Sequence, residues 1–164
     1  MRPRSLESNK KMNTAMEFST FLLKAKQKTY ATGGEGTEEN LEDGTRELSY
    51  REGSFFYRDR YFGFNPFIGE EVVWENGKAV WAMNYYGMVT DESVPVGDVY
   101  RFLQNAMQRV QAERPFRGPD QYEDGDFVYK DASEGNLSQF SGEEVIFFQK
   151  KQVYVLRYHG GKVG

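Results

Sequence analysis

The sequence predicts an α+β fold: an internally duplicated unit of one helix and three or four strands, whose two copies form one curved antiparallel sheet with two helices on one face. Three observations support this prediction. Two segments have the apolar spacing of amphipathic helices, alternating strand patterns follow each of them, and the two halves of the chain share sequence at a nearly constant offset. With 164 residues, the chain is expected to form a single domain, assigned to residues 14–164.

The first helix is expected to begin at Thr14, because Thr14 and Glu17 have the spacing of a capping box. Apolar residues then recur at helical spacing until Gly33 and Gly34 end the segment. They are Phe18, Phe21, Leu22 and Ala25. The polar, basic residues 1–13 favour a flexible arm, and the acidic residues 33–45 favour a mobile loop.

Residues 46–87 alternate as β-strands do, and Asn76-Gly77 predicts a tight hairpin because both residues tolerate the positive φ of a type I′ turn. A second helix is expected over residues 96–112, before Pro115. Three further strands are expected over residues 126–132, 143–149 and 152–159.

The duplication rests on a match between residues 69–87 and residues 142–160. Eight of these 19 aligned positions are identical, including a shared Gly-Glu-Glu-Val run. Upstream, the motif Phe-x-Tyr-[Arg/Lys]-Asp begins at Phe55 and again at Phe127. We therefore expect two related halves, residues 14–90 and 94–161, with a pseudo-two-fold axis between them.

Composition excludes several classes of function. The chain has no cysteine and one histidine, so disulfide scaffolds, thiol nucleophiles and Cys- or His-cluster metal sites are not expected. The net charge of −4 disfavours direct nucleic-acid binding. No apolar run is long enough for a membrane span, so we expect a cytoplasmic protein. We also expect no cofactor and no metal.

A candidate ligand site follows from the hairpin register. If the Asn-Gly turn is followed by regular pairing, Glu71 lies opposite Ala82, and the sheet face away from the helices is too apolar to be open to water. We expect a groove there that binds a small organic molecule, and two acids near aromatic rings suit a cationic one. The candidate ligand-binding residues are Glu71, Asn84, Tyr86, Glu144, Arg157 and His159.

Several alternatives remain open from the sequence. If the face assignment is inverted, Glu70 and Glu143 replace Glu71 and Glu144. The apolar face could instead be a homodimer interface, which Val73→Asp or Ile146→Asp would disrupt. The tandem glutamates could also serve a carboxylate-dependent hydrolase. No nucleophile or ligand set supports a named reaction, however, so a non-enzymatic function is favoured.

Six motifs are distinctive. They are Leu-Leu-x-Ala-Lys from Leu22, Leu-x-Tyr-Arg-Glu-Gly from Leu48, Gly-Glu-Glu-x-x-Trp from Gly69, Val-Trp-Ala-Met-Asn-Tyr-Tyr-Gly from Val80, Phe-Arg-Gly-Pro from Phe116 and Tyr-His-Gly-Gly from Tyr158.

Over about residues 17–163, these motifs make the chain resemble a family of uncharacterised prokaryotic domains. Those domains occur alone or C-terminal to XRE-type helix-turn-helix domains, so the resemblance implies a separate DNA-binding regulator as a partner. It implies no activity and no site residues. The expected element order is also similar to that of gyrase-inhibitor-like effector-binding domains, which bind organic molecules in a groove between their halves.

Overall fold

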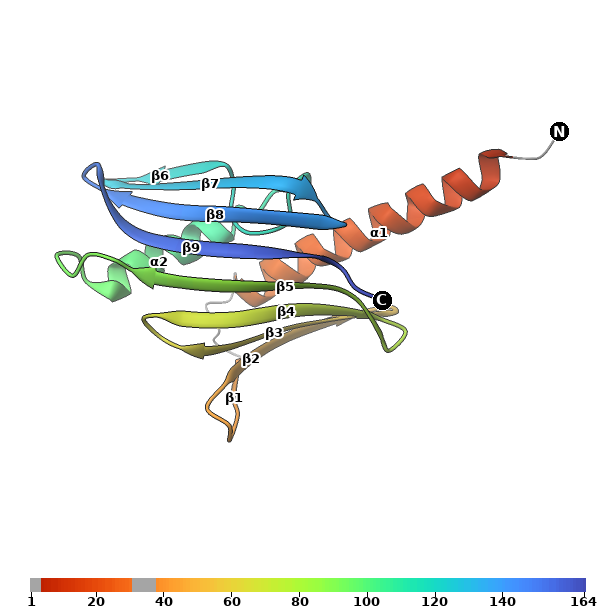
Figure 1. Cartoon of the computed structure of the whole chain (residues 1–164), viewed down its shortest axis with the longest axis horizontal. Helices are drawn as coiled ribbons and strands as arrows, with labels where there is room; N and C mark the ends of the chain where they lie inside the picture. Colours follow the sequence, from red (N-terminus) through yellow and green to blue (C-terminus); the bar gives the residue numbers. More distant parts are fainter. Residues whose placement is uncertain (1–3, 31–37) are drawn as a thin grey trace.

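The computed structural model describes residues 4–30 and 38–164, which form two helices and one nine-stranded sheet (Figure 1). The helices are α1 (Arg4–Tyr30) and α2 (Val96–Met107). The strands of the first half are β1 (Glu39–Asn40), β2 (Arg46–Glu52), β3 (Phe55–Gly63), β4 (Phe67–Glu75) and β5 (Lys78–Val89). Those of the second half are β6 (Gln121–Asp124), β7 (Phe127–Asn136), β8 (Gln139–Phe148) and β9 (Lys151–Lys162).

The sheet is antiparallel throughout, in the order β1-β2-β3-β4-β5-β9-β8-β7-β6. The last strands of the two halves, β5 and β9, pair at its centre, where Tyr85 lies opposite Tyr158. The predicted α+β class, the curved antiparallel sheet and the two helices are therefore confirmed. The duplication stays a prediction.

Both helices pack on one face of the sheet, which we call the inner face. The core between the layers consists largely of rings and aliphatic side chains, among them Phe21 and Leu22 of α1, Phe102 of α2 and Trp81 of β5. In the stacked pair Trp81–Phe140 the ring centroids are 5.6 Å apart. The aromatic side chains that are abundant in the sequence thus fill the space between the helices and the sheet.

The helix boundaries differ from those predicted. α1 begins at Arg4, so Thr14 lies inside the helix rather than at its start; no glycine or proline interrupts residues 4–30. α2 ends at Met107 rather than at residue 112. Residues 33–37 of the predicted acidic loop lie outside the described residues, and residues 38–45 include β1 and its turn towards β2.

The hairpin register also differs. Asn76 and Gly77 have φ of 50° and 82°, as predicted for the turn, and Glu75 pairs with Lys78. A β-bulge next to Val73 then shifts the pairing, so that Val73 lies opposite Trp81 and Glu71 opposite Met83. The β8–β9 hairpin has a shift next to Ile146. Because one extra residue exchanges the two faces of a strand, the predicted outer positions of Glu71 and Glu144 are wrong.

Candidate functional site

The structure separates the six predicted site residues into two groups. Asn84, Tyr86, Arg157 and His159 lie on the outer face, opposite the helices, where β5 pairs with β9 and Asn84 faces His159. They line a shallow hollow of about 780 Å³. Glu71 and Glu144 are instead fully buried on the inner face.

Glu71 is held by a cation from α1. The Lys26 Nζ atom lies 2.5 Å from Glu71 Oε2 and also donates to the Phe116 carbonyl oxygen at 2.6 Å. Burial lowers the pKa of Lys26, and the attraction of the Glu71 carboxylate opposes that shift. The ion pair therefore ties α1 to β4 inside the core.

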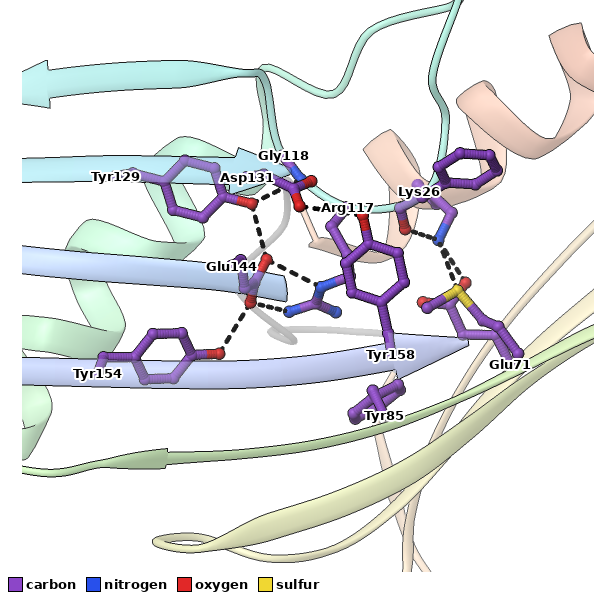
Figure 2. Close-up of polar contacts among 12 residues, drawn as sticks. Lys26, Glu71, Tyr85, Arg117, Gly118, Tyr129, Asp131, Glu144, Tyr154 and Tyr158 are labelled. Carbon is purple, nitrogen blue, oxygen red and sulfur yellow. Dashed lines mark hydrogen bonds and ion pairs between the residues drawn. The ribbon is translucent and has the colours of Figure 1, made fainter. Parts of the chain in front are cut away.

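Glu144 is surrounded by four donor atoms (Figure 2). The Arg117 guanidinium donates to both oxygens, from Nε at 3.1 Å and from Nη2 at 2.8 Å. The hydroxyls of Tyr129 and Tyr154 donate at 2.7 and 2.8 Å. Such dense hydrogen bonding compensates the cost of burying a charge, so Glu144 serves as a structural anchor for the loop after α2.

Two tyrosine–aspartate pairs lie on either side of the β5–β9 seam. The Tyr85 hydroxyl donates to Asp59 Oδ1 at 2.6 Å, and the Tyr158 hydroxyl donates to Asp131 Oδ1 at 3.0 Å. Burial, followed by repulsion from Glu71 and Glu144 respectively, raises the pKa of each aspartate to about 7. Both carboxyls therefore titrate near neutral pH.

The cavity beside Asp59 is the candidate site. It has a volume of about 450 Å³ and lies between the end of α1, α2 and strands β2–β5. Asp59, Tyr85 and Arg117 line its buried side, and aliphatic and aromatic side chains such as Leu48 and Leu103 line its walls. We call it the Asp59 cavity.

Most residues of this site are not among those predicted from the sequence, although one signal is present there. Asp59 and Asp131 end the repeated Phe-x-Tyr-[Arg/Lys]-Asp motif, which was used as evidence of duplication and not of chemistry. Lys26 follows Leu22 by four residues on the helix, next to the apolar stripe, and the spacing alone could have placed it in the core. Arg117 lies in a loop and had no comparable signal.

The structure separates the tandem glutamates of β4. Glu70 and Glu71 lie on opposite faces of β4, so the tandem glutamates do not form a carboxylate pair. Among the residues whose side chains are described, which are 14, 17–29 and 38–164, no three His, Cys, Asp or Glu residues gather as metal ligands would. A cavity with apolar walls and a few buried polar groups is typical of a small-molecule site.

A family model described as "Domain of unknown function (DUF5680)" matches residues 59–163. The chain belongs to this family. The DUF5680 match begins at Asp59 and includes Glu71, Tyr85, Arg117 and Glu144, whereas Lys26 and α1 precede it. No curated protein and no solved structure shows significant similarity to the chain. Neither described helix of this DUF5680 protein is both long and apolar enough to cross a membrane.

Proposed function

We propose that this protein is a non-enzymatic binding domain that holds a small organic molecule in the Asp59 cavity. The observation that carries the proposal is a buried, ionisable carboxyl in the wall of an otherwise largely apolar cavity of about 450 Å³. Cavities of this size suit organic ligands, and a buried polar group gives such a ligand its orientation.

The surrounding network supports the proposal by making the site rigid. Asp59 is fixed by Tyr85, and Arg117 is fixed by Glu144 through two hydrogen bonds. A polar group held in place before binding loses little conformational entropy when a ligand arrives. The cavity wall is therefore organised for recognition.

The test is a fragment titration with a variant that fills the cavity. Gly97 lines the cavity, and a Cβ atom there would meet no atom within 4 Å, so a larger side chain has room to enter. We expect small aromatic and aliphatic fragments to shift the amide NMR signals of β3 and α2 in the wild type and in Gly97→Ala. Gly97→Trp is designed to place its ring in the cavity and should abolish these shifts.

Two results would contradict the proposal. One is that no fragment shifts the β3 and α2 signals; the other is that Gly97→Trp binds as the wild type does. Amide shifts confined to β8 and β9 would indicate that the fragments bind instead in the outer hollow, which is lined by Asn84, Tyr86, Arg157 and His159.

A second candidate function is self-association through the outer face. Phe62, Ile68 and Tyr86 lie side by side across β3, β4 and β5, and each is about half exposed. An exposed apolar row of this kind is typical of an interface. Val73 and Ile146, which the sequence placed on this face, are instead fully buried and cannot test it.

Light scattering after size exclusion tests self-association. A dimer predicts twice the chain mass for the wild type, restored to one chain mass by Ile68→Asp. The matched control is Val163→Asp, because Val163 is similarly exposed but lies at the end of the chain. A wild type that stays monomeric when concentrated would contradict this function. A cytoplasmic location and a separate DNA-binding regulator as partner stay predictions.

A further inference from the structure

We infer that the Asp59 cavity selects an organic cation, with the Asp59 carboxylate as counter-ion and aromatic rings as the surrounding wall. The inference rests on the proposed function and names the class of ligand. It is carried by the juxtaposition of a buried acid with ring-bearing residues that line the same cavity, which besides Tyr85 are Tyr61, Phe64, Phe67 and Tyr100.

The rings form a connected wall. Tyr100 of α2 meets Phe64 and Phe67 edge-on, with centroids 5.2 and 5.7 Å away and interplanar angles of 80° and 84°. The Tyr100 hydroxyl donates to the Phe64 carbonyl oxygen at 2.6 Å, which fixes the ring. Perpendicular rings direct π-faces along different directions, as in sites that bind alkylated ammonium groups.

The charges around the cavity favour a cation at its buried end. Two cations act on Asp59, and each is paired with another carboxylate. The Arg117 Nη2 atom lies 2.8 Å from Glu144 Oε1, and the Lys26 Nζ atom lies 2.5 Å from Glu71 Oε2. At the mouth, Arg101 is paired with Asp98. An anion placed against Asp59 would be repelled at low dielectric, whereas a cation would be attracted.

Further charged groups at the mouth offset one another. Glu38 accepts a hydrogen bond from the Tyr61 hydroxyl, and the Arg46 guanidinium lies 6.0 Å from the centre of the same ring. One acid and one base therefore stand at Tyr61, so the mouth contributes little net attraction for either sign of charge. Selection by charge is left to the buried end of the cavity.

Cation binding is expected to depend on pH through Asp59. Its pKa is about 7, mainly because the carboxyl is buried. The charged and titratable groups that face it from the surrounding elements are Lys26 of α1, Tyr57 of β3, Glu71 of β4, Tyr85 of β5 and Arg117 of the loop after α2. Because the ionised fraction of Asp59 rises about tenfold between pH 6 and pH 8, a cation with no titration of its own should bind roughly tenfold more tightly at pH 8 than at pH 6.

The experiment compares three probes of similar size on the full chain. They are phenyltrimethylammonium, its neutral isostere tert-butylbenzene and the anion 3-phenylpropionate. The key variant is Asp59→Asn, which removes the charge and keeps the shape. Asp131→Asn is the matched control, because Asp131 is also buried and bonded to a tyrosine but does not line the cavity.

We expect phenyltrimethylammonium to bind most tightly and to shift the β3 and α2 amide signals in NMR titrations. Asp59→Asn should weaken the binding of phenyltrimethylammonium roughly tenfold or more and remove the pH dependence of that binding. Asp131→Asn should leave the affinity and its pH dependence unchanged. Equal or tighter binding of the neutral or anionic probe at the same amides would overturn the cation assignment and leave the binding function standing. The absence of shifts at these amides with all three probes would overturn both.

Discussion

At the scale of single residues, the Lys26–Glu71 ion pair shows how a strongly polar group becomes part of this core. Both side chains are fully buried, and Lys26 also reaches the Phe116 carbonyl oxygen and lies 5.9 Å from the Trp81 ring centre. Removing one member of a buried pair costs far more than the net contribution of the intact pair, since the remaining charge has lost its solvation.

Lys26→Met is therefore expected to lower the free energy of unfolding by about 3–5 kcal/mol. The matched control is Lys24→Met on the same helix. Lys24 pairs with Glu52 in an exposed position, so its loss should change the free energy of unfolding only slightly. Urea denaturation followed by circular dichroism measures both. Equal losses for the two variants would contradict a special role for the buried pair.

At the scale of elements, the limit of sequence analysis lies in the two β-bulges. The strand pattern and the Asn76-Gly77 turn were sufficient to predict the β4–β5 hairpin and its first pair, Glu75 with Lys78. The bulge beyond them reverses the faces, and no local pattern in the sequence marks it, because valine suits either face of a strand. The same shift recurs near Ile146, so Glu71 and Glu144 were misplaced together.

In the two hairpins, a tyrosine ring packs directly over a glycine of the paired strand. A Cβ atom on Gly142 of β8 would lie 2.2 Å from the Tyr158 ring, and one on Gly69 of β4 would lie 2.3 Å from the Tyr85 hydroxyl. Each tyrosine reaches its aspartate by lying across a glycine of the neighbouring strand. The glycines therefore provide space for the hydrogen bonds beside the seam.

Gly142→Ala is expected to displace the Tyr158 ring and to lower the free energy of unfolding by about 1–3 kcal/mol. Gly97→Ala is the control, because a Cβ there meets no atom and alanine favours the helix, so this variant should be neutral or stabilising. The midpoints of urea denaturation of the two variants and of the wild type measure these changes in stability. A Gly142→Ala variant as stable as the wild type would show that the Tyr158 ring can shift at no cost.

At the scale of the whole molecule, the two buried aspartates make stability depend on pH. Asp59 and Asp131 have pKa values of about 7 in the folded protein, against about 4 for an aspartate in an unfolded chain. Between these values the folded state binds more protons than the unfolded state. The stabilisation is therefore complete below about pH 4 and is lost as the pH rises through about 7.

The double variant Asp59→Asn, Asp131→Asn should lack this dependence, because asparagine does not titrate. We expect its free energy of unfolding to rise relative to that of the wild type from pH 5 to pH 7, by at most about 1.4 kcal/mol per pH unit for each carboxyl. Urea denaturation of both proteins across this range measures the difference. Since all other titrating groups are shared, a difference that stays constant with pH would mean that neither aspartate is protonated in the folded state.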